Sequence, residues 1–565
     1  MKKYQSLLYI TILAASLLCG CVKLDEELFS DLPAAGYYTD KNAVEAAVVR
    51  PYEHGQWCGW DGDRWILQEL SADQFVWTQK GKHGYDDGQW IRMHGHNWDV
   101  RQGQIYGGWT GPYQGIMQCI TIGGDIEKLD YATMGLTPED KKRHLAELKT
   151  LKAWFYIFLL DFFRKVPIIQ NVGESQPQSE PEQVFAYIEK ELKDALPDLP
   201  KNSTVPGRWD QGGAAALLVR LYLNAEKWIG KPKYTECAQW AQDIINGKYG
   251  TYSLDTDYRG PFRSGVGGYR SPENIFEFPH KLDIYNFGWM YNAMQHYAMR
   301  YALDNDWGSW NGVHLTPSRD LDGNIYAGFK LGKPYEKYAA TDKRKQAFRT
   351  TSATGDYEGF FMVGQVYEYN AAKGFGYDST KKVNGSEEYN GQPLRFVDQV
   401  GRFSEKPGGR WAEGSHVATG EENSGVRLLK FPWLQKSKGL FMSNSAPEIR
   451  LAEIYYSLAE CKYRAGDKAG AAVLIDAVKK RNFSTANWPA QSYVANPGKL
   501  TDDEFIDELG REFIGERHRR PDLIRWNRFG NAWWDKAADA KDKTVFPIPQ
   551  KAIDANPDFI KPNGY

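Results

Sequence analysis

One apolar pattern constrains the fold of this chain more than any other feature. Between Leu145 and Phe163 the large apolar side chains recur at intervals of three and four residues, which places them on one side of an α-helix. The segment Arg164-Lys165-Val166-Pro167 then ends the helix, because proline disfavours helical backbone at the residue before it. A helix of this length cannot bury its apolar side alone, so other helices must cover it.

Other stretches of the chain supply helices with the same spacing. Thr39-Asp40 is typical of a helix N-cap, and the segment from Asp210 to Ala225 is dense in Ala and Leu. Two further helices are predicted on either side of the turn Gly466-Asp467. These two helices are about 446–465 and 468–481, and the remaining predicted helices are about 109–126, 182–196 and 234–245. Helical pairs of this size favour a mainly α fold built on a frame of TPR-like hairpins.

The middle of the chain has a different character. Gly, Asn, Asp, Tyr and Trp dominate residues 250–440, and helical periodicity is sparse there apart from a stretch near Met290 to Tyr301. Residues 52–110 also have the composition of loops. Long irregular segments in a compact protein are usually functional. We therefore expect one domain over 40–565, in which a loop-rich, irregular insert at about 250–440 forms the ligand surface. The helical frame is expected at about 40–245 and 445–565.

The N-terminus has the features of a secretory signal peptide. Lys2 and Lys3 precede a short apolar run that ends in Leu18-Cys19-Gly20-Cys21. The run is shorter than the roughly 20 apolar residues that span a bilayer. A cysteine directly after a small residue resembles a bacterial lipobox, in which the first mature residue carries the lipid. We expect a signal peptide over 1–20, lipidation at Cys21, and an anchor and linker over 21–39.

Composition excludes several classes of function. Lys plus Arg is 70 and Asp plus Glu is 72, which gives no electrostatic footprint for nucleic acid or for a polybasic membrane surface. The four cysteines beyond Cys21 are far apart and form no CxxC pair, so buried free thiols are favoured, and a disulfide between two of them is the alternative. These four are Cys58, Cys119, Cys237 and Cys461.

Aromatic residues are gathered in two regions together with polar side chains. Seven tryptophans fall between Trp57 and Trp109, interleaved with Gly, Asp, Asn and His, and a second group lies near Trp307. A sugar ring has apolar C–H faces and polar edges, so its binding site needs exposed aromatic rings beside amide or carboxylate groups. The ligand-binding candidates are Asp73, Trp77, Trp90, Asn97, Trp98, Trp289, Trp307, Trp310 and Asn311.

No pattern in the chain indicates catalysis, a cofactor or a metal. There is no P-loop, no GxSxG and no HExxH motif. His83, His94 and His96 lie close together in sequence, which leaves a transition-metal site as an alternative, but their spacing matches no metal motif. We expect no cofactor, no metal and no catalytic residues.

At the C-terminus the segment ERHRRPDLIRWNRFG is followed by FPIPQKAIDANPDF. These lie at Glu516–Gly530 and Phe546–Phe559, and three earlier segments go with them: Glu147–Ile169, Gly207–Leu223 and Pro447–Glu460. Together the five segments resemble the SusD/RagB family of surface glycan-binding lipoproteins, and they occur in the family's order. The charged residues between 450 and 525 are interpreted as inter-helix ion pairs, since Arg offers fixed paired donors to carboxylates.

The resemblance implies a non-catalytic lipoprotein on the outer face of a Gram-negative, Bacteroidetes-type outer membrane. It would capture an oligosaccharide or polysaccharide and pass it to a TonB-dependent outer-membrane transporter of the SusC type. The acidic segment directly after Cys21 is similar to the export tag of such surface lipoproteins. Two alternatives remain: a peptide-binding member of the same family, and an all-helical glycoside hydrolase, which would need two carboxylates about 5–10 Å apart across a cleft.

Overall fold

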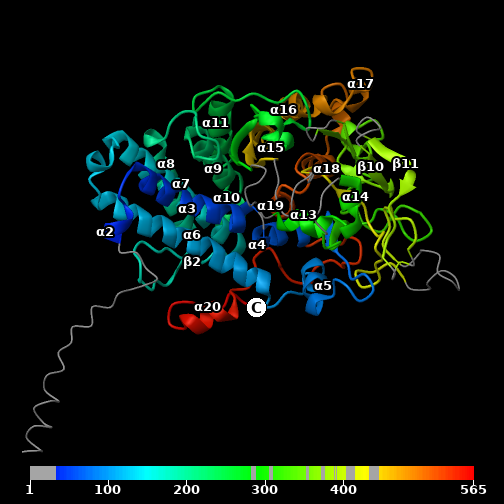
Figure 1. Ribbon diagram of the computed structural model, residues 1–565, viewed down its shortest axis with the longest axis horizontal. Helices are drawn as coiled ribbons and strands as arrows, with labels where there is room; N and C mark the ends of the chain where they lie inside the picture. The colour runs from blue at the N-terminus through cyan, green and yellow to red at the C-terminus, as the bar shows by residue number, and fades with distance from the viewer. Residues whose placement is uncertain are drawn as a thin grey trace, which may run out of the picture.

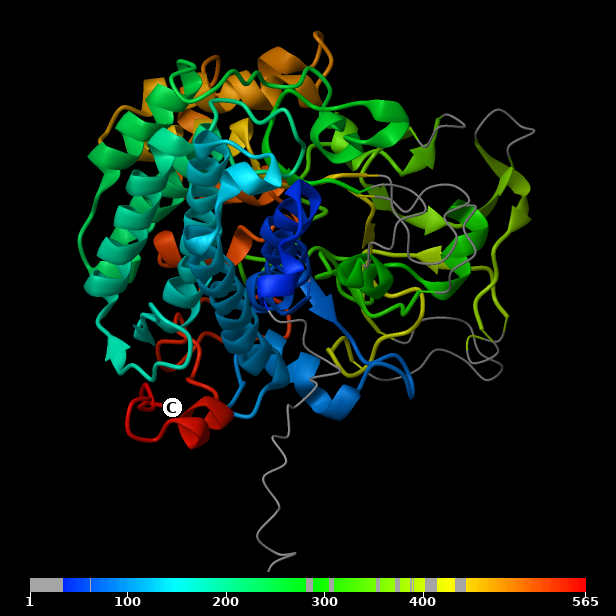
Figure 2. The same ribbon diagram turned by 60° about the vertical axis from the view of Figure 1, so that its left-hand side comes forward.

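The computed structural model describes residues 34–565 apart from 61, 281–287, 304–308, 352–355, 371–375, 387, 388, 390, 402–413 and 432–443. Helices fill one half of the molecule, and short strands and loops fill the other (Figures 1 and 2). The predicted mainly α fold, a helical frame with a loop-rich insert, is confirmed. Across the described residues, no helix has the length and apolar character needed to cross a membrane.

The first part of the frame is a set of helices that pack on their sequence neighbours. They are α2 (Ala34–Tyr37), α3 (Lys41–Gly55), α6 (Gly103–Lys128), α7 (Pro138–Phe163), α8 (Pro181–Ala195), α9 (Gln211–Leu223), α10 (Ala225–Ile229) and α11 (Tyr234–Ile245). Helix α7 contacts both α6 and α8, and α9 contacts α11. The predicted cap of α3 is Asp40, whose carboxylate accepts from the backbone N–H groups of Asn42 and Ala43.

Helix α7 begins earlier than its apolar pattern predicts. Its N-cap is Thr137, whose hydroxyl and the carboxylate of Asp140 bond each other's backbone N–H groups, and Pro138 occupies the first turn. The apolar pattern reports only the buried part of the helix, which is why it misses the solvated first turns. Helix α6 lies so close to α7 that a Cβ on Gly115 would come within 2.4 Å of the Phe155 ring.

The second part of the frame follows the insert. It contains α15 (Leu451–Arg464), α16 (Lys468–Lys479), α17 (Trp488–Gln491), α18 (Asp502–Glu512), α19 (Arg519–Arg525) and α20 (Gln550–Ala555). The prediction that α15 starts at Ala446 is wrong. Residues Ala446–Arg450 form strand β14, which pairs antiparallel with β4 (Asn274–Phe278). Pro447 and this pairing keep the segment extended until Leu451.

The loop-rich regions contain short elements. Residues 52–110 hold more helix than predicted, because α4 (Gly62–Trp65), α5 (Gln89–His94) and two π-helical turns, Gln56–Trp60 and Ile66–Leu70, lie there. The described insert is built from α12 (Gly260–Arg263), α13 (Trp289–Met294), α14 (Arg300–Leu303) and strands of two to seven residues in two-stranded pairs. These include β8 (Phe361–Met362) with β13 (Arg427–Leu428) and β10 (Tyr367–Asn370) with β11 (Gly376–Lys382). The boundaries of the insert stay a prediction.

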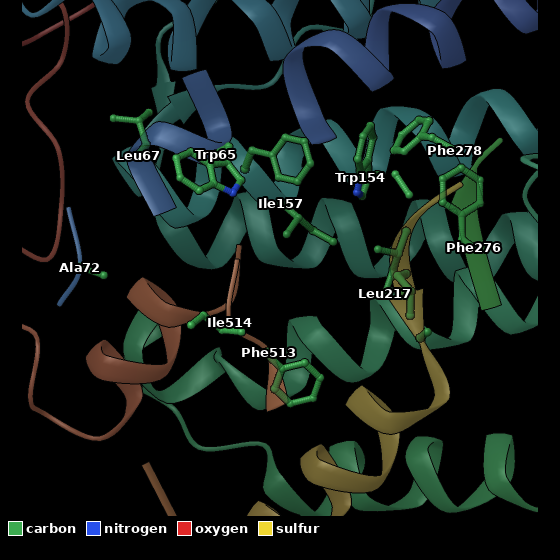
Figure 3. Packing of buried hydrophobic residues seen from close by; sticks show 14 of the residues in the cluster. Trp65, Leu67, Ala72, Trp154, Ile157, Leu217, Phe276, Phe278, Phe513 and Ile514 are labelled. Atoms are coloured by element: carbon green, nitrogen blue, oxygen red, sulfur yellow. The ribbon is translucent and has the colours of Figure 1, made fainter. Parts of the chain in front are cut away.

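One hydrophobic core joins the two parts of the frame. Figure 3 shows Trp154 of α7 between Trp65 of α4 and the phenylalanines of β4. The Trp154 and Phe278 ring centroids are 5.9 Å apart. Trp65 and Trp154 are fully buried, so the early tryptophans include core residues.

Buried ion pairs reinforce this core around β14. Glu448 is paired with Arg64 at 2.9 Å, Arg220 at 2.5 Å and Arg517 at 3.2 Å. Burial alone would raise the pKa of Glu448, but the three guanidinium groups outweigh it and hold that pKa well below its usual range. Arg450 is paired in turn with Glu273, Glu512 and Glu516. The interpretation of these charges as ion pairs is confirmed, but Glu448 and Arg450 lie on a strand. Pairs between helices are those of Arg520 with Asp161 and of Arg525 with Glu460.

The variant Glu448→Gln should therefore lose stability strongly, because it leaves three buried guanidinium groups without their shared carboxylate. We expect a loss of about 3–5 kcal/mol in the free energy of unfolding at pH 7, measured by urea denaturation. Glu127→Gln, at an exposed position on α6, is the matched control. A loss no larger than that of the control would contradict the role assigned to Glu448.

Candidate functional site

A short antiparallel ladder brings the two aromatic regions of the sequence together. Strand β1 (Phe75–Trp77) pairs with β5 (Val313–Leu315), and Trp77 lies opposite Val313. Strand β1 belongs to the early, tryptophan-rich stretch and β5 to the insert. The residues just before β5 therefore lie beside those of β1, although the two strands are far apart in sequence.

Trp77 forms a stacked pair with Trp90 of α5. Their ring centroids are 4.5 Å apart and the planes are inclined by 11°. The Nε1 of Trp90 donates to the Asp86 carboxylate at 2.6 Å, which fixes the orientation of the ring. Gly312 allows the insert to approach, because a Cβ at that position would lie 2.3 Å from the Trp77 ring. Asp86 therefore orients the ring of Trp90, and Gly312 packs closely on the ring of Trp77.

The segment before β5 is fastened to the end of α13. The backbone N–H groups of Trp310, Asn311 and Gly312 donate to carbonyl oxygens of residues 292, 295 and 293 at 2.8–2.9 Å. Asn311 has a φ of +54°, in the left-handed region that asparagine tolerates, and its side-chain oxygen accepts from Arg427 at 2.7 Å. The side chain of Trp310 is 44% exposed.

These aromatic residues line an open cavity of about 690 Å³. That volume is within the usual range of small-molecule sites. The polar groups around the rings are amides, hydroxyls, carboxylates, one lysine and one histidine. The described lining residues are Asp63, Ile66, Trp77, Thr78, Lys80, His83, Gly84, Asp86, Gln89, Trp90, Gln104, Tyr297, Ser309, Trp310, Asn311, Ser386 and Glu422. We call this cavity the aromatic pocket.

Glu422 organises one part of the pocket wall. Its carboxylate accepts from Nε2 of His296, from the Tyr297 hydroxyl and from the Ser386 backbone N–H, each at 3.0 Å. Burial raises its pKa, but the hydrogen bonds from His296 and Ser386 outweigh burial and lower the pKa to about 2. Glu422 is therefore an ionised carboxylate that aligns three neighbours.

Asp63 occupies a different part of the wall, beside α6. No hydrogen bond or ion pair reaches its half-buried carboxylate from the part of the chain that the structure describes. Burial raises the pKa of Asp63 to about 7. On α6, Gln104 donates to the Gln89 side chain at 2.8 Å, so two amides stand in the same lining.

Comparison with known proteins points to one family. The sequence profile of the SusD family matches residues 272–544. Starch-binding protein SusD of Bacteroides thetaiotaomicron is 24% identical over 79% of this chain and 78% of its own length. Both matches show that the chain is similar to the SusD family.

Solved structures of SusD-like proteins share the fold. Surface glycan-binding protein A from Bacteroides thetaiotaomicron, in complex with laminarihexaose, matches with a TM-score of 0.63 and 18% identity. The match covers 93% of this chain and all of that one. A laminarin-binding SusD-like protein matches with a TM-score of 0.56 and 20% identity, over 94% of this chain and all of that one. At this identity the likeness establishes the fold alone.

Only some of the predicted ligand residues line the aromatic pocket. Those that do are Trp77, Trp90, Trp310 and Asn311. Trp307 and the side chain of Trp289 lie outside the described part, as does Cys21. Asn97 is exposed but is not among the lining residues.

The structure places Asp73 and Trp98 in the scaffold, which corrects their predicted role. Asp73 is fully buried and holds Arg519 through two contacts of 2.6 and 2.9 Å. Burial raises the Asp73 pKa, but Arg519 outweighs it and lowers the pKa to about 2. Trp98 is 3% exposed and packs on Phe546, with ring centroids 4.9 Å apart. Both residues connect the early stretch to the C-terminal part, a contact that sequence spacing cannot reveal.

The histidines that suggested a metal alternative are separated in the fold. His94 bonds the Trp534 carbonyl and His96 bonds Asp539, both in the interior, whereas His83 is exposed at the pocket. Over the described ranges, no group of three or more His, Cys, Asp or Glu is arranged to hold a metal ion. The four cysteines after the N-terminal segment are buried and free.

Sequence reasoning missed several pocket residues, and the signals for them were weak. Ser386 and Glu422 belong to parts of the insert without periodicity, so nothing in the sequence links them to Trp77. Asp63 falls in Asp61-Gly62-Asp63, a composition typical of turns, although the structure places Asp63 in helix α4. Gln104 is one polar residue at the start of a long helix, and only the packing of α6 against α4 gives it a role.

The half-buried Asp63 predicts a pH-dependent effect on stability. Because its pKa is raised, its contribution to folding is complete below about pH 4 and is lost as the pH rises through about 7. Asp63→Asn resembles the protonated form at every pH. We therefore expect the variant to melt above the parent protein at pH 8 and level with it at pH 4, in thermal unfolding monitored by circular dichroism. An equal difference at both pH values would show that Asp63 is not protonated in this range.

Proposed function

We propose that this protein is a non-catalytic receptor that binds an oligosaccharide in the aromatic pocket. The observation that carries the proposal is the convergence of the Trp77–Trp90 stack and the exposed Trp310 on one open cavity. The exposed ring of Trp310 matches the apolar C–H face of a sugar, and the largely buried Trp77 and Trp90 form the wall beside it. The amides of Gln89 and Gln104 match their hydroxyl edges, since each amide both donates and accepts.

The related proteins support the same ligand class. One relative is named for binding starch, and two proteins of the same fold are described with laminarihexaose and with laminarin. The sugar and its linkage are not transferred to this chain from them. A peptide ligand is the alternative, because, of the three tryptophans in the described lining, Trp310 is exposed, whereas Trp77 and Trp90 are 7% and 6% exposed.

Trp310→Ala should weaken glycan binding while leaving the fold intact, because Trp310 is exposed and lines the pocket. We expect a loss of about 2 kcal/mol in binding, or about 30-fold in Kd. A glycan array with the mature protein would identify a ligand, and calorimetry on parent and variant would then give the Kd values.

Trp98→Ala is the matched control for that experiment. Truncating this buried ring should cost about 3–5 kcal/mol of stability, because it leaves a cavity against Phe546. If Trp310→Ala bound its glycan as tightly as the parent protein, the aromatic pocket would not be the ligand site.

The proposal includes the absence of catalysis. Glu422, one of the three carboxylates in the described lining, is fixed by hydrogen bonds from its neighbours, as expected of a residue that positions groups. Purified protein incubated with its bound glycan should release no reducing ends over a day at 37 °C. Turnover that persisted across independent preparations would favour the glycoside hydrolase alternative.

We also propose that Cys21 is lipidated, that the protein is anchored on the outer face of the outer membrane, and that it delivers its ligand to a SusC-type, TonB-dependent transporter. The lipobox-like Leu18-Cys19-Gly20-Cys21 and the family support this arrangement.

Cys21→Ala tests the anchor. The variant should lose labelling by a fatty-acid analogue and leave the membrane fraction, since no other anchor is proposed. One acyl chain binds only marginally and stable anchoring takes at least two signals, so the cysteine should carry several chains. The parent protein, expressed at the same level, is the reference. Retention of the variant in the membrane fraction would contradict the assignment.

A further inference from the structure

The charges around the aromatic pocket are unbalanced. Asp63, Asp86 and Glu422 contribute three carboxylates, whereas Lys80 and His83 are the basic residues of the described lining. No arginine stands among the described lining residues. Arginine and lysine are the side chains that proteins use to bind carboxylate and sulfate groups, because their N–H groups donate hydrogen bonds that replace those the anion made with water.

Lys80 is poorly placed to form an ion pair with an anionic ligand. Its side chain is 5% exposed, and its ammonium group donates to the carbonyl oxygens of Gly312 at 2.8 Å and Thr78 at 3.4 Å. Burial, with a contribution from Arg427, also lowers the pKa of Lys80 well below its ordinary range, which suppresses its positive charge.

The three carboxylates differ in their hydrogen bonding. Glu422 is held by His296, Tyr297 and Ser386, and Asp86 accepts from Trp90. Asp63 alone receives no hydrogen bond or ion pair from the described residues and has its carboxylate in the pocket wall. An ionised carboxylate in that position accepts strong hydrogen bonds from hydroxyl groups and repels anions.

We propose that the aromatic pocket takes uncharged sugars and excludes uronate and sulfate groups, and that Asp63 is the residue that sets this selectivity. The inference rests on the proposed glycan-binding function and names its ligand class. A uronate entering the pocket would lose water and meet carboxylates without an arginine to pair with. A neutral sugar would instead offer a hydroxyl donor to Asp63.

Matched pairs of oligosaccharides test the proposal. Cello-, laminari-, malto- and xylo-oligosaccharides are placed on an array with C6-oxidised uronate forms of the three hexose series and with sulfated forms of all four. Binding is measured at pH 8 and low ionic strength. We expect the neutral member of the bound series to bind and its anionic forms to bind at least about tenfold more weakly, since like charges across a few ångströms cost about 1 kcal/mol or more.

Asp63→Asn identifies the residue responsible, and it keeps the size and shape of the side chain. The ratio of uronate to neutral affinity should rise about fivefold in this variant, because one repulsive charge has gone. Asp194→Asn, at an exposed position on α8 that is not part of the lining, should leave the ratio unchanged. Melting curves establish that both variants are folded.

The outcomes separate the inference from the function on which it rests. Tight binding of anionic forms would overturn the charge selectivity while leaving glycan binding in place. A neutral preference that Asp63→Asn did not reduce would overturn the role of Asp63. Failure of every glycan to bind would overturn the proposed function itself, and the inference with it.

Discussion

The fold depends on a short strand that carries two opposite buried charges. In β14, Glu448 is paired with three arginines and Arg450 with three glutamates. These partners come from both parts of the frame and from the insert. Burying these charges costs solvation, so the pairs are favourable only in one geometry. We infer that they select the arrangement in which the end of the insert lies between the two sets of helices.

The aromatic pocket follows from that arrangement. Once β14 fixes the insert, β5 can pair with β1, and this pairing sets Trp310 beside the Trp77–Trp90 stack. The scaffold supplies rigid positions and the loops supply the varied side chains, a division common among binding proteins. The chain shares its fold with proteins that are 18% and 20% identical to it.

The predicted ligand residues show how far the role of a residue can be predicted from the sequence. Tryptophans among polar neighbours indicated a binding surface, yet Trp98 packs in the core and Trp310 lies at the pocket. Both have neighbours of similar polarity in the sequence. Their difference arises from Phe546, a residue of the distant C-terminus that covers Trp98. Burial of a large side chain is decided by what packs on it, and sequence neighbours do not report that.

The sequence by itself determined the mainly α frame, the resemblance to the SusD family and the ion-pair character of the C-terminal charges, because helical periodicity, caps and charge patterns are local. It also placed the pocket candidates in two regions. The tertiary structure decided that these regions converge through β1 and β5, that Ala446–Arg450 is a strand, and that Asp73 belongs to the scaffold. It also brought Asp63 and Glu422 to the pocket. The physical reason is that strand pairing, burial and charge pairing join residues hundreds of positions apart, and no local pattern encodes those partners.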